Sequence, residues 1–100
     1  MLTHIVMMRI KTHFSKSEKQ TALDKLVQLL EKLPLSIPEV EFLEIGLNVS
    51  TKAPAYDLVL TSKFGDQAAL ERYIVHPDHQ KVFEHISEVV AEVALVDYLG

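Results

Sequence analysis

Apolar and polar residues nearly alternate along the first segment of the chain, from Thr3 to His13. One face of this segment carries the more apolar set, which is His4, Val6, Met8 and Ile10, and the other carries Ile5, Met7, Arg9 and Lys11. A period of two is typical of a β-strand. Because both faces are at least partly apolar, we expect each face to pack against another layer.

A helix is predicted next. Ser15 opens it and Glu18 follows three residues later, which is the capping box Ser-x-x-Glu. Apolar residues then recur at helical spacing, at Ala22, Leu23, Leu26, Val27, Leu29, Leu30 and Leu33. Pro34 and Pro38 are predicted to stop this helix and to form a connector.

The rest of the chain predicts two strands, a broken helix and a last strand. The strands cover about 40–50, where Gly46 indicates a bulge or a close backbone approach, and 56–64. Asp66 caps a short helix ending near Val75, the His76-Pro77 pair breaks it, and a further helix runs over about 78–93. With a final strand at 94–99, the order βαββαβ predicts an α+β, ferredoxin-like fold for a single domain over 1–100.

The sheet face opposite the helices is predicted to form a homodimer. In this topology both helices cover one face, and the other face carries Ile5, Met7, Val59 and Thr61. Such an apolar face is unfavourable in water, and a two-fold arrangement with a second copy would bury it.

Composition excludes several classes of function. The 100 residues carry a formal net charge of −4 and no clustered basic surface, so we expect no nucleic-acid partner. The absence of cysteine excludes disulfides, thiolate metal sites and a cysteine nucleophile. No signal peptide and no membrane span are recognisable, so we expect a cytoplasmic protein without a membrane partner.

Three of the five histidines stand out. His13 and His85 are expected to be solvated, whereas His4 has the parity of the helix-covered face and is expected at the mouth of a cavity. His76 and His79 lie in the segment that follows Tyr73 across the helix break. A tyrosine hydroxyl and an imidazole can together move a proton near neutral pH, although these residues can equally brace the break. His76-x-x-His79 lacks a third ligand at good spacing, so no metal is expected.

Six segments in order resemble the stress-responsive A/B barrel (Dabb) family. They are His4-Ile5-Val6, 46–50, 56–60, Phe64-Gly65-Asp66, 73–79 and Val96-Asp97-Tyr98, and the histidine-proline element with its preceding tyrosine is the most specific of them. The resemblance implies a ferredoxin-like fold and a dimeric α/β barrel. One plant member, olivetolic acid cyclase, closes a polyketide by aldol condensation without a cofactor, and its catalytic tyrosine and histidine lie where Tyr73 and His79 stand.

The resemblance and the residue pattern leave three functions open. The first is a dimer that binds a small apolar or aromatic molecule between sheet and helices. The second is a cofactor-independent cyclase, lyase or isomerase, with His79 as general base, Tyr73 at the oxyanion and His4 orienting the substrate. The third is a purely structural dimer. The expected cavity wall consists of Val6, Met8, Leu23, Leu26, Val27, Leu58, Leu60 and His76.

Overall fold

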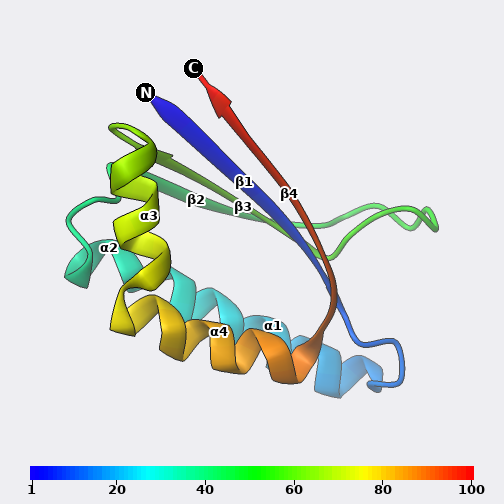
Figure 1. Ribbon diagram of the computed structural model, residues 1–100. Coiled ribbons are helices and arrows are strands. Elements are labelled where there is room, and N and C mark those ends of the chain that lie inside the picture. The colour runs from blue at the N-terminus through cyan, green and yellow to red at the C-terminus, as the bar shows by residue number, and fades with distance from the viewer.

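A four-stranded sheet covered on one face by helices makes up the computed structural model, which describes residues 1–100 (Figure 1). The elements in chain order are β1 (Leu2–Ile10), α1 (Lys16–Glu31), α2 (Leu33–Ser36), β2 (Phe42–Leu47), β3 (Leu58–Phe64), α3 (Gln67–Val75), α4 (Pro77–Val89) and β4 (Val90–Leu99). The sheet order is β2-β3-β1-β4, with every neighbouring pair antiparallel. The predicted ferredoxin-like fold is confirmed.

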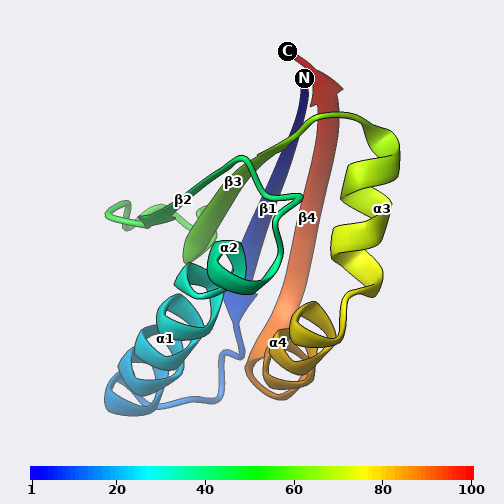
Figure 2. The same cartoon turned by 90° about the vertical axis from the view of Figure 1, so that its left-hand side faces the viewer.

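The hydrophobic core lies between the sheet and the helices. Figure 2 shows α1 and α4 beneath the sheet and α3 alongside it, all on the same face. The inward positions of β3, which are Leu58, Leu60, Ser62 and Phe64, are all buried, as the period of two predicts. None of the helices is long and apolar enough to cross a membrane.

The start of α1 is as the capping box predicts. The Glu18 amide donates to Ser15 Oγ at 3.1 Å, and the Ser15 amide donates to Glu18 Oε1 at 2.9 Å. The end differs from the prediction, because α1 stops at Glu31 and Pro34 lies in the first turn of α2. Proline is tolerated in the first turn of a helix, where its missing N–H has no partner to lose.

The second strand is shorter than predicted because a local turn ends it. The Asn48 side chain accepts from the Ser50 amide and donates to the Ser50 carbonyl, both at 2.9 Å, and so competes with strand pairing. Gly46 marks a close approach rather than a bulge. It pairs in regular register with Val59, and a Cβ atom there would lie 2.9 Å from Val59 Cγ1.

The boundary between α4 and β4 was predicted wrongly. The helix ends at Val89 instead of near residue 93, and β4 begins at Val90, which pairs with Ile10. Val90 and Val93, expected on the helix, therefore belong to the strand. Their β-branched side chains favour strands, and pairing with β1 stabilises the strand conformation.

The expectation that His85 is solvated was also wrong. Its side chain is only 9% exposed, because it lies three residues after Val82 and four before Val89 on the buried stripe of α4. His13 is exposed, as expected.

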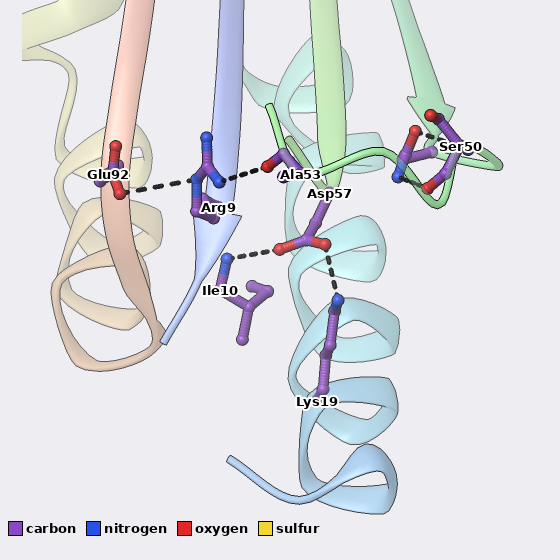
Figure 3. A network of polar contacts seen from close by, with 8 residues as sticks. Arg9, Ile10, Lys19, Ser50, Ala53, Asp57 and Glu92 are labelled. Atoms are coloured by element: carbon purple, nitrogen blue, oxygen red, sulfur yellow. Dashed lines mark hydrogen bonds and ion pairs between the residues drawn. The ribbon is translucent and has the colours of Figure 1, made fainter. Parts of the chain in front are cut away.

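A polar network holds the long β2–β3 connection against the end of β1 (Figure 3). Asp57 accepts from the Ile10 amide at 2.8 Å and pairs with Lys19 Nζ at 2.6 Å. Arg9 donates to the Ala53 carbonyl at 3.4 Å and lies 3.6 Å from a carboxylate oxygen of Glu92. The network joins α1, the connection and two strands at one end of the sheet.

Candidate functional site

His4, Tyr73 and His79 line one cavity of about 200 Å³ between the sheet and the helices. Every other side chain in its wall is apolar. These side chains are Val6, Met8, Leu30, Leu60, Ile74, Phe83, Ile86, Val93 and Leu95. Three polar side chains on an apolar wall form the usual pattern of a small-molecule site.

The break between α3 and α4 positions Tyr73 and His79. Proline at 77 begins α4, and the extended backbone of His76 separates the two helices. The His76 amide donates to the Tyr73 carbonyl at 3.2 Å, and His76 Nδ1 accepts from the Asp78 amide at 3.1 Å. The break is therefore held by its own hydrogen bonds, with Tyr73 in the last turn of one helix and His79 in the first turn of the next.

The three rings lie close together. The ring centroids of Tyr73 and His79 are 4.6 Å apart, and those of Tyr73 and His4 are 6.4 Å apart. Phe64 supports Tyr73 from the sheet at 4.9 Å. Tyr73 is only 1% exposed, and its hydroxyl makes no hydrogen bond within the chain. That hydroxyl is thus available to a bound molecule.

Burial determines the protonation states of Tyr73 and His79. It raises the pKa of Tyr73 to about 12, so the hydroxyl stays protonated and can donate at neutral pH. Burial is also the main reason that the pKa of His79 lies below its usual value. A hydrogen bond with the Ile74 backbone opposes this effect, and positive charge on His4 or His76 lowers the pKa further. His79 is therefore neutral near pH 7, with its Nδ1 atom buried and without a partner.

His4 has a charged neighbour that the other two rings lack. It stands directly opposite Asp97 in the β1–β4 pairing, and its Nδ1 atom contacts Asp97 Oδ1. Residues paired across two strands project from the same face of the sheet, which explains the contact.

Comparison with known proteins identifies the family. Residues 2–99 match the sequence profile of the stress responsive A/B barrel domain. The chain belongs to the stress responsive A/B barrel family. A relative in Streptomyces coelicolor, itself uncharacterised, is 30% identical over 80 residues, which is 80% of each chain.

Solved structures similar to this A/B barrel domain include one bacterial and one plant protein. A dimeric ferredoxin-like protein of unknown function from Bacteroides fragilis superposes with a TM-score of 0.90 at 26% identity, over 97% of this chain and 93% of that one. The hydroxynitrile lyase of Passiflora edulis superposes with a TM-score of 0.81 at 17% identity, over 97% and 90%. The second likeness shows the fold alone.

The remaining residues expected in the wall of this A/B barrel cavity divide into two groups. Val6, Met8 and Leu60 line it, but Leu23, Leu26, Val27, Leu58 and His76 do not. Residues Leu23, Leu26 and Leu58 lie in the packed core, and His76 caps α4. The cavity lies instead toward α4 and β4, whose apolar wall residues Phe83, Ile86, Val93 and Leu95 were not predicted from the sequence.

Asp97 and the β4 wall residues could have been found from strand parity. Val93, Leu95 and Asp97 project from the face of β4 that pairs with the inner face of β1. Finding them requires knowing that β4 starts at Val90 and lies beside β1.

No three His, Asp or Glu side chains gather closely enough to hold a metal ion.

Proposed function

We propose that this A/B barrel protein is a homodimer that binds a small, uncharged apolar or aromatic molecule in the cavity beneath its sheet. The observation that carries the proposal is the apolar cavity on which one tyrosine hydroxyl and two imidazoles converge. An apolar cavity of about 150 Å³ accommodates benzene, so a volume of about 200 Å³ suits a single-ring molecule. The wall contains no lysine or arginine, so nothing in it compensates the desolvation of an anion.

Binding can be tested with two probes of similar size and different charge. Acetophenone, which is neutral, should shift the amide NMR signals of Ile74, Phe83 and Leu95, and benzoate should leave them unchanged. Leu95→Trp should abolish the shifts, because this half-exposed wall position can take a large ring that fills the cavity. Leu99→Trp is the matched control on the same strand face outside the cavity. Equal binding of benzoate, or none of acetophenone, contradicts the proposal.

The dimer is proposed to form through the outer face of the sheet. The apolar residues on this face are Ile5, Met7, Val59, Ala94, Val96 and Tyr98, in adjacent register. Met7 is 38% exposed and Val96 58%, which is unfavourable for such an apolar surface unless a second copy covers it. The similar protein from Bacteroides fragilis is dimeric.

Light scattering at micromolar concentration should give twice the 11.3 kDa chain mass. Met7→Asp should dissociate or unfold the dimer, because the new carboxylate would be buried without a partner. Leu35→Asp is the control, since Leu35 is exposed on α2 and remote from this face. A monomeric wild type, or a dimer unaffected by Met7→Asp, excludes this interface.

The pairing of a neutral imidazole with a protonated tyrosine favours a second candidate function. This is a cofactor-independent polyketide cyclase or lyase, or a lactone isomerase. His79 would remove a proton from carbon next to a carbonyl, Tyr73 would donate to the developing enolate oxygen, and His4 would orient the substrate or relay the proton. Such general base catalysis typically contributes about 10²–10⁴-fold. The similarly folded Passiflora edulis enzyme is a lyase, which is compatible with this chemistry on this scaffold.

The proton-transfer step can be isolated from any natural substrate. Hydrogen–deuterium exchange at the benzylic carbon of phenylacetone, followed by NMR, should be faster with the protein than in buffer. His79→Ala and Tyr73→Phe should each remove most of the acceleration while the dimer persists. His13→Ala, which changes an exposed histidine, should have no effect. Acceleration that survives both site variants assigns these residues a structural role.

A further inference from the structure

The contact between His4 and Asp97 determines where the proton of this imidazole lies. A carboxylate only accepts hydrogen bonds, so the Nδ1 atom of His4 that touches Asp97 Oδ1 has to carry a hydrogen. In the neutral ring the other nitrogen, Nε2, then holds a lone pair. His4 is only 7% exposed and lines the cavity, and its Nε2 atom has no hydrogen-bond partner within the chain.

We propose that Asp97 is the positioning residue of this site, holding the proton of His4 on Nδ1 so that Nε2 remains as a hydrogen-bond acceptor at the cavity wall. A carboxylate that fixes the tautomer of a neighbouring imidazole is a known arrangement in catalytic sites. Here the imidazole is buried, whereas the side chain of Asp97 is 31% exposed. The effect acts through His4, since Asp97 is absent from the cavity wall.

The same pair of polar groups also defines the class of ligand, an inference that rests on the proposed function. Tyr73 supplies a hydrogen-bond donor and His4 an acceptor to the same apolar cavity. A complementary molecule has a neutral skeleton about the size of one ring. It carries a carbonyl that accepts from Tyr73 and a hydroxyl or enol that donates to His4. The geometry therefore points to hydroxy-carbonyl compounds, and it disfavours plain hydrocarbons because they would leave both polar groups unpaired.

The tautomer can be measured without any ligand. Long-range ¹H–¹⁵N NMR correlations of the wild-type dimer at neutral pH should show His4 Nδ1 as protonated and Nε2 as unprotonated. Asp97→Ala should abolish that preference, whereas Glu88→Ala, which removes an exposed carboxylate on α4, should preserve it. A proton on Nε2 in the wild type overturns the proposal. An unchanged tautomer in Asp97→Ala also overturns the proposal, even if thermal stability falls. The contact between His4 and Asp97 would then only join β4 to β1.

The ligand class is tested with 3-hydroxyacetophenone and 3-methoxyacetophenone, which differ only in the hydroxyl hydrogen and its methyl replacement. The hydroxy compound should bind the wild type about tenfold more tightly, as expected for one additional hydrogen bond. Asp97→Ala should remove that difference and leave the affinity for the methoxy compound nearly unchanged. Equal affinities in the wild type overturn the assignment of the ligand class. If neither compound binds, the proposed function fails, and the NMR measurement still decides the role of Asp97.

Discussion

Asp57 offers a quantitative test of how the β2–β3 connection is held against the sheet. Its side chain is only 12% exposed and makes two different interactions. It accepts from the Ile10 amide at 2.8 Å, where a shift in the β1–β4 register between Arg9 and Ile10 disturbs the regular ladder. It also pairs with Lys19, whose side chain is 45% exposed (Figure 3).

The two interactions should contribute unequally to stability. Asp57→Ala leaves the buried Ile10 amide without its acceptor, which costs about 1–3 kcal/mol, and it also loses the ion pair. An ion pair with a half-exposed lysine contributes at most about 1 kcal/mol. Asp57→Asn retains an oxygen that can accept from Ile10, so it should cost about as little as Lys19→Ala. We expect Asp57→Ala to lower the free energy of unfolding by about 1–4 kcal/mol.

Urea unfolding at one fixed protein concentration measures these differences, because the stability of a dimer depends on concentration. Added salt should lower the stability of the wild type more than that of Asp57→Ala, because only the wild type has the ion pair that salt screens. If Asp57→Asn and Lys19→Ala are each as damaging as Asp57→Ala, the ion pair carries the stability and the reasoning from the Ile10 amide is wrong.

Three further predictions concern single positions. Ser15→Ala should cost about 1 kcal/mol in urea unfolding, as the loss of an N-cap does, and an unchanged midpoint would show that the cap contributes nothing. Gly46→Ala should lower the free energy of unfolding by about 1–3 kcal/mol, because the new Cβ atom would overlap the stiff Val59 side chain. A variant as stable as the wild type would show that β2 and β3 can move apart to accommodate it. The low pKa of His79 should make stability fall as pH drops below about 6.5, because the unfolded chain then binds a proton that the folded chain does not. Above that pH both states are neutral and the effect vanishes, and His79→Gln should reduce this pH dependence in thermal melts.

Much of the fold could be predicted because local signals agree with tertiary packing. The alternation along β1 separates a face under the helices from an outer face, and the capping residues Ser15 and Asp66 mark the starts of α1 and α3. The α4–β4 boundary could not be predicted in the same way. Val89 and Val93 are four residues apart and fit a helical stripe, so only the pairing of Val93 with Met8 shows that the chain has become a strand.

The same ambiguity limited the prediction of the site. His4, Tyr73 and His79 could be selected from strand parity and from the helix break, which are local features. The wall could not, because the apolar face of α1 packs directly into the core and its residues Leu23 and Leu26 leave no room there. The cavity lies beside β4, whose residues Val93 and Leu95 line it, and that position follows only from tertiary structure.

The last strand links the two proposals physically. Val93, Leu95 and Asp97 project toward the helices, where the first two line the cavity and the third holds His4. The alternate residues Ala94, Val96 and Tyr98 belong to the outer face proposed for the dimer. Because β4 lies at an edge of the sheet and pairs only with β1, a second copy on its outer face would restrict the movement of the cavity wall. Ligand affinity should therefore be compared between variants only at concentrations where their assembly state has been measured, since loss of the dimer and loss of a wall contact would both weaken binding.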